Sequence, residues 1–117
     1  MGFFYRNAQI ASGQSESEVI SLPVGSELSG IKIPLGFDGT FITFEVGFDR
    51  DDPDFAPLYD GAGQKVSLQV LPERVIGLPE NLVCFCLLAH FRLRSAGAAD
   101  ATVVQSAART LQLLCRG

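Results

Sequence analysis

The chain has 117 residues, of which 47% are hydrophobic and 19% are charged, and its net charge at pH 7 is −4. This length fits one domain, and a chain so apolar and so weakly charged is not disordered as a whole. The net negative charge argues against nucleic acid as the main partner. No apolar run reaches the roughly 18 residues that a membrane-spanning helix needs, so we expect no membrane partner.

The first residues, MGFFYR, lack the charged start and the long apolar centre of a secretory signal, which predicts synthesis in the cytoplasm. Three adjacent aromatic residues do not fit a half-buried strand, because alternate members would face water. Two interpretations follow: a strand covered on both faces, or an arm that docks on another subunit. The residues that would contact a partner in the second case are Phe3, Phe4, Tyr5 and Arg6.

Short stretches of alternating apolar and polar residues follow one another along the chain, and each ends at Pro, Gly or a polar turn. The pattern predicts strands over 19–22, 28–34, 41–48, 55–59, 65–71, 75–78, 91–95 and 109–116. About eight short strands at this spacing predict an all-β fold, an antiparallel β-sandwich or jelly roll. We expect an N-terminal arm over 1–12 and a single β-sandwich domain over 13–117.

The stretch from 36 to 63 organises the predicted fold. Its strand directs one set of alternating side chains into the core: Ile42, Phe44, Val46 and Phe48. An acidic loop follows, and the chain then re-enters the core at Phe55, Leu58 and Tyr59. The next four residues, DGAG, predict a turn.

Two segments allow more than one structure. Residues 80–89 are the most apolar stretch and predict either a doubly buried strand or a helical turn that closes one end of the fold. Residues 102–108 fit one helix face, whereas a strand is favoured for 109–116 because the last segment of an all-β domain must pair with a sheet edge. Further candidates for partner contact in the apolar stretch are Leu82, Phe85 and Leu88.

The four aspartates around Pro53 are the first candidates for a chemical site. The spacing of the acidic residues partly matches an EF-hand, but the position that requires Gly is occupied by Asp54. A solvated loop is therefore favoured over a calcium site. The weak candidates for metal ligands are Asp49, Asp51, Asp52 and Asp54.

No enzymatic signature is present, so we expect neither a catalytic activity nor a cofactor. Cys84, Cys86 and Cys115 have no second pair and no His at zinc spacing, which predicts buried free thiols. His90 is the only histidine and is expected to be structural.

Arg92 and Arg94 lie two apart on one predicted strand face. They predict either a grip for a carboxylate or phosphate, or, as the favoured interpretation, ion pairs with acidic residues of a neighbouring strand. Residues 1–60 have a net charge of −7 and residues 61–117 of +3. The two halves either mix in the fold, which is favoured, or form an acidic and a basic edge that meet in a head-to-tail ring.

Several short motifs, in this order, resemble small structural proteins of tailed bacteriophages. The motifs are IKIP at 31–34, GTFITFE at 39–45, LYDGAG at 58–63, FRLRS at 91–95 and QSAARTL at 105–111. The resemblance covers roughly residues 28–116 and implies a jelly-roll module on the virion surface. Such modules usually have a polar segment before the Arg-x-Arg strand, where this chain is apolar, and this difference marks a candidate subunit contact.

The resemblance implies a capsid decoration or cement protein, made in the host cytoplasm and located on the capsid surface. Its partners would be the major capsid protein, which it would bind and stabilise without catalysis, and further copies of itself in a homotrimer. The alternative is a tail, baseplate or surface carbohydrate-binding module that attaches to a host glycan, because jelly rolls commonly bind sugars through their loops.

Overall fold

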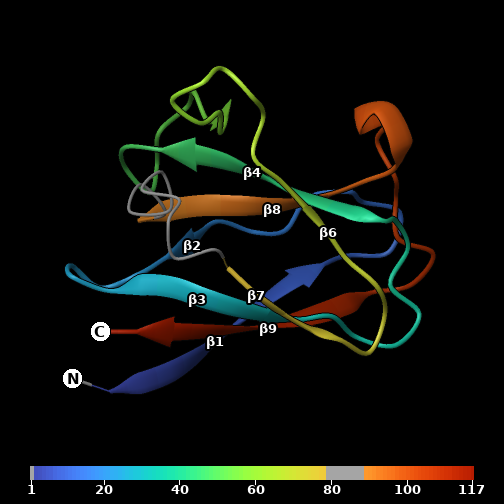
Figure 1. The fold of residues 1–117 in the computed structure, drawn as a ribbon, viewed down its shortest axis with the longest axis horizontal. Coiled ribbons are helices and arrows are strands. Elements are labelled where there is room, and N and C mark those ends of the chain that lie inside the picture. Colours follow the sequence, from blue (N-terminus) through green and yellow to red (C-terminus); the bar gives the residue numbers. More distant parts are fainter. Residues whose placement is uncertain (1, 79–88) are drawn as a thin grey trace.

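The structure is a computed structural model that describes residues 2–78 and 89–117. These residues fold into two antiparallel sheets that pack face to face (Figure 1). The first sheet contains, in spatial order, β1 (Phe3–Ile10), β9 (Arg109–Arg116), β3 (Glu27–Lys32) and β7 (Val75–Gly77). The second contains β2 (Ile20–Ser21), β8 (His90–Ala96), β4 (Phe41–Gly47) and, both beside β4, β5 (Ala56–Pro57) and β6 (Ser67–Gln69).

The strand pairs are nested from the ends of the chain towards its middle. β1 pairs with β9, β2 with β8 and β3 with β7, and β4 pairs with both β5 and β6, which occupy two halves of one position. The chain is thus folded like a long hairpin that has been rolled up into two sheets. This nested antiparallel order is that of a jelly roll, so the predicted all-β sandwich is confirmed.

The core lies between the sheets and is built from side chains that alternate along the strands. On β9, Leu111, Leu113 and Cys115 are fully buried, which confirms the strand predicted over 109–116. Phe44 of β4 and Phe91 of β8 meet edge to face in the second sheet, with ring centroids 6.3 Å apart. The two sheets therefore bury one aliphatic and one partly aromatic face against each other.

Two aromatic side chains predicted for the core lie at the surface. Phe48 is 91% exposed, because β4 ends at Gly47 and the chain turns there. The Asp52 carboxylate accepts the N–H of Phe48 at 3.1 Å and holds this turn. Tyr59 is 53% exposed, whereas its neighbour Leu58 is buried as predicted.

The N-terminal segment is a strand of the first sheet. Residues 3–10, predicted as the larger part of a separate arm, pair with β9 along their whole length. Ala8 and Ile10 are fully buried and belong to the hydrophobic core. The expected boundary after residue 12 therefore does not divide an arm from the sandwich.

The structure describes residues 101–108 and one of the three cysteines, whereas the predicted contact residues of the apolar stretch lie outside the described part. Residues 101–108 connect the 3-10 turn η2 (Ala98–Asp100) to β9 without a helix. Cys115 is a buried free thiol, and burial raises its pKa. The predicted residues outside the described part are Leu82, Cys84, Phe85, Cys86 and Leu88.

A buried glutamine anchors the connection that leads into β9. Gln105 is 1% exposed; its Oε1 accepts the N–H of Asp38 at 2.9 Å, and its Nε2 donates to the carbonyl of Asp38 at 2.7 Å. The Asp38 carboxylate accepts hydrogen bonds from the N–H and the hydroxyl of Ser106, and these bonds lower the pKa of Asp38. The loop before β4 and the loop before β9 are thereby held together.

We predict that Phe44→Ala lowers the free energy of unfolding by about 3–5 kcal/mol, because it removes a fully buried ring and leaves a cavity. Phe48→Ala, in the same predicted strand, should change it by less than about 0.5 kcal/mol. Urea unfolding followed by circular dichroism measures both. Equal losses in the two variants would contradict the observed end of β4.

We predict that Gln105→Leu costs roughly 2–4 kcal/mol, because it leaves the Asp38 N–H and carbonyl without their partners. The matched control is Gln112→Leu, since Gln112 has an exposed side chain on β9 and should tolerate the change within about 0.5 kcal/mol. Thermal unfolding of the two variants, side by side, provides the comparison. A Gln105→Leu protein as stable as the control would rule out the anchoring role.

Candidate functional site

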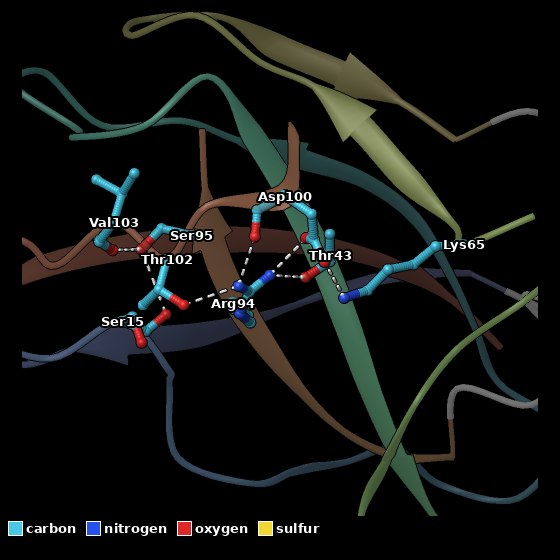
Figure 2. Close-up of polar contacts among 8 residues, drawn as sticks. All are labelled: Ser15, Thr43, Lys65, Arg94, Ser95, Asp100, Thr102 and Val103. Carbon is cyan, nitrogen blue, oxygen red and sulfur yellow. Dashed lines mark hydrogen bonds and ion pairs between the residues drawn. The ribbon is translucent and has the colours of Figure 1, made fainter. Parts of the chain in front are cut away.

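The outer face of the second sheet carries a cluster of charged and polar side chains around Arg94 (Figure 2). The Arg94 Nη1 lies 2.7 Å from Asp100 Oδ1, and its Nη2 donates to the Asp100 carbonyl at 3.0 Å and to Thr102 Oγ1 at 2.9 Å. The Lys65 Nζ contacts the second carboxylate oxygen of Asp100, also at 2.7 Å. A single carboxylate therefore bridges two cations from different segments.

The sheet and the following turn together position this cluster. Arg94 lies opposite Thr43 in the pairing of β8 with β4, and both side chains point to the outer face, where their contact measures 3.4 Å. In η2, Ala99 and Asp100 have φ values of 55° and 61°, in the left-handed region that costs a residue with a Cβ about 1 kcal/mol or more. Asp tolerates this region better than Ala, and the turn directs its carboxylate back over Arg94.

Each charged side chain of the cluster is paired with an opposite charge of the same chain. The hydrogen bonds from Lys65 and then Arg94 hold the pKa of Asp100 below its ordinary value, so the carboxylate stays ionised near neutral pH. Two positive charges and one negative charge leave the cluster with one net positive charge. No member of this trio is a free base or nucleophile at its observed contacts.

A shallow pocket of about 140 Å³ adjoins the cluster. Pockets that bind substrates or cofactors usually enclose about 300–1,000 Å³, so this one suits only a very small molecule or a few waters. Its polar groups are Lys65, Asp100 and Ser67, and the first two are already paired with each other. The pocket therefore lacks the size and the free reactive groups of an active site.

Arg92 is paired in the same way further along β8. Its Nη2 lies 2.9 Å from Glu45 Oε1 on β4, its Nε lies 3.6 Å from Glu16 Oε2, and its guanidinium stacks 4.9 Å from the centroid of the Phe55 ring. The favoured interpretation, ion pairs with acidic residues of a neighbouring strand, is confirmed for Arg92, whose partner Glu45 lies on β4. The partner of Arg94, Asp100, lies instead in the turn η2 that follows β8. Arg92 also joins the acidic first half of the chain to the basic second half.

The acidic loop is organised by its own backbone. The Asp52 carboxylate accepts the N–H groups of Phe48 and Asp54, at 3.1 and 2.8 Å, and these bonds lower the pKa of Asp52. The Asp49 carboxylate accepts the N–H of Asp51 at 3.4 Å. In the part of the chain that the structure describes, no three acidic, His or Cys side chains are close enough to hold a metal ion. The structure thus does not bring the calcium candidates together.

His90 has a structural setting. Its Nδ1 lies 2.9 Å from the hydroxyl of Ser21, the residue opposite it in the pairing of β2 with β8. The described contacts give this pair no acidic third member that would orient the ring for catalysis. The expected structural role of His90 is consistent with this geometry.

The remaining candidate is the outer edge of β1, where aromatic side chains are exposed. Phe3 and Tyr5 are 67% and 62% exposed and share the outer face of the first sheet, and Phe4 is half-buried on the opposite face. Arg6 lies over the Phe4 ring at 4.9 Å from its centroid. All four residues predicted for partner contact in this segment therefore lie on one edge strand of a folded sheet.

Sequence reasoning did not single out Lys65, Asp100 or Gln105. Asp100 ends a loop of small residues, and its partner Lys65 is 35 positions away, so no local pattern signals the pair. Gln105 belongs to the QSAARTL motif, whose pattern gives no sign that this side chain is buried. These residues become visible as sites only when the strands are in register.

Comparisons with protein-family models, with curated proteins and with solved structures found no match to this chain. The resemblance to virion proteins therefore stays a prediction from the sequence motifs. Among the described residues, no helix is long and apolar enough to cross a membrane.

We predict a pH-dependent loss of stability for Asp100→Asn. Because the pKa of Asp100 is lower in the folded than in the unfolded state, its ionised form stabilises the fold above a pH of about 4, and this contribution is lost as the pH falls through the folded-state pKa. The cluster is partly exposed, so the loss at pH 7 should be at most about 1 kcal/mol.

Urea unfolding at pH 7 and at pH 3 measures this difference, which should shrink at the lower pH. Asp54→Asn is the matched control, since its carboxylate makes no hydrogen bond in the described structure. A deficit of the same size at both pH values would mean that the carboxylate charge is not what stabilises the turn.

Proposed function

We propose that this chain is a non-enzymatic structural protein of a virion, which binds a protein shell as a capsid decoration protein and associates with further copies of itself. The observation that carries the proposal is the pair of exposed aromatic rings, Phe3 and Tyr5, on an edge strand. The sequence motifs resemble those of phage structural proteins, and for this reason we propose that the shell is a phage capsid. The partner on the shell would be the major capsid protein.

The setting of the two rings suits a binding surface. Tyr and Phe are enriched at interfaces because they bring a large contact area at a low entropic cost. Here the strand itself is fixed by β9, so little further order is lost on binding. Half-buried Leu114 of β9 lies opposite Tyr5 in the sheet and extends the apolar area beside the two rings.

The ion pairs on the second sheet support a role without catalysis, because they engage its cationic side chains within the chain. Arg92, Arg94 and Lys65 are each engaged with an acidic side chain of the same chain, and the adjoining pocket measures about 140 Å³. A shell protein needs many modest contacts that are multiplied by copy number rather than one reactive group. A rigid sandwich with exposed aromatic side chains on one edge strand meets this requirement.

We predict that the double variant Phe3→Ser, Tyr5→Ser loses most of its binding to purified shells, because it removes both exposed rings. Val24→Ser and Leu35→Ser are the controls, since both residues are exposed apolar positions in turns outside β1. Co-sedimentation with shells that lack the protein measures the bound fraction. Unchanged occupancy by the double variant would overturn the proposed surface.

The location itself is tested by quantitative mass spectrometry of purified virions. A copy number that is a simple fraction of the major capsid protein supports a place on the shell. A handful of copies per particle would instead favour the tail or baseplate alternative, with a glycan as the ligand to test next. Complete absence from the virion would overturn the proposal.

A further inference from the structure

The outer edge of β1 directs backbone groups away from the sheet at every second residue. Gly2 and Gly117 exchange both of their backbone hydrogen bonds, so the even-numbered residues of β1 bond to β9. The odd-numbered residues therefore direct their N–H and carbonyl groups away from the sheet. Gln9 confirms this phase, because its N–H is held from outside by the Glu18 carboxylate at 3.1 and 3.2 Å.

The Glu18 contact also limits the length of the open edge. Beyond Gln9, the bridge between Ile10 and Ser17 continues the cover. The open part consists of Phe3, Tyr5 and Asn7, all of which have exposed side chains. Native edges are usually blocked by Pro, Lys or a covering segment. Among the residues that the structure describes, the one contact on this part of the edge is a weak bond from Arg6 to the Tyr5 carbonyl, at 3.3 Å.

The open edge is complementary to itself in one register. In an antiparallel pair, residues that point their backbone groups at each other must both be odd-numbered here. Pairing Tyr5 with Tyr5 of a second copy places Phe3 opposite Asn7 and uses all three open residues, with about six hydrogen bonds in total. Shifting the register by two residues in either direction leaves one of the three unpaired or runs into the segment at Glu18.

The side chains agree with this register. It places Phe4 of one copy directly opposite Arg6 of the other, so the guanidinium-on-ring contact seen within the chain is repeated between the chains. The two Arg6 residues are not opposite each other, which avoids repulsion between like charges. The exposed rings of Phe3 and Tyr5 from both copies come to lie on one continuous outer face.

We propose that two copies of this chain pair through β1, antiparallel and with Tyr5 on the two-fold axis, to join their first sheets into one sheet of eight strands. The inference rests on the self-association included in the proposed function and gives it a surface and a symmetry. The contact is isologous and therefore closes after two copies. This differs from the homotrimer that the resemblance implies.

The test is the mass of the purified full-length protein by light scattering after size exclusion, from 1 to 500 μM. The expected result is a shift from 12.6 kDa to twice that mass within this range. Tyr5→Pro should raise the dissociation constant on the order of tenfold or more, because it removes an outward N–H and crowds the partner strand. The β1·β9 bonds of the same strand are untouched, since the Tyr5 N–H takes no part in them.

Tyr5→Thr is the matched control, because it removes the ring and keeps the backbone donor and the strand propensity. It should remain dimeric, and thermal unfolding should show both variants folded. A wild-type protein that stays at 12.6 kDa at 500 μM overturns the pairing, as does a Tyr5→Thr variant that dissociates as far as Tyr5→Pro. If the wild-type protein is monomeric but still co-sediments with shells, the pairing alone is refuted. If it is dimeric but does not bind shells, the decoration role alone is refuted.

Discussion

The register of β4 against β8 is the constraint on which both faces of the second sheet depend. Phe44 lies opposite Leu93 and Thr43 opposite Arg94, within an unbroken run of pairs along both strands. Because successive side chains point to opposite faces, this one register sends Phe44 and Leu93 into the core and Thr43 and Arg94 outward. A slip of one residue would bury Arg94 against the apolar sheet, at a cost of several kcal/mol. The core and the polar cluster are therefore formed by the same event.

The two sheets treat their outer surfaces differently, and this difference decides which surface is available for function. The outer face of the second sheet carries η2, and Arg92 and Arg94 each form an ion pair with an acidic side chain of the same chain. The first sheet ends in β1, which keeps open backbone donors and exposed aromatic rings. Assembly needs a rigid surface that is still open to a partner, and β1 is the described segment that meets this need, which is why the proposed function is placed there.

Sequence patterns were sufficient where a strand carries its own alternation. The faces of β6, β8 and β9 follow period two without interruption, and buried residues such as Leu68, Phe91 and Leu113 lie where the pattern puts them. The pattern failed at Phe48, because the alternation continues past the point where Asp52 turns the chain. It was also undecided over the aromatic run, where Phe4 faces inward and its two neighbours outward. Local sequence patterns therefore predict which face of a strand a side chain occupies better than they predict where the strand ends.

The rest depends on contacts between distant parts of the chain. The partners of Gln105 and Lys65 are 67 and 35 positions away, so only the completed register brings them together. At β1 the decisive contact is nearer, nine positions along, where Glu18 reaches back to Gln9. That contact ends the open edge, the length of the open edge selects the register of the proposed pair, and this register gives the pair its two-fold symmetry. The Glu18 carboxylate, which no sequence pattern marks as functional, thus limits which register two copies can adopt through this strand.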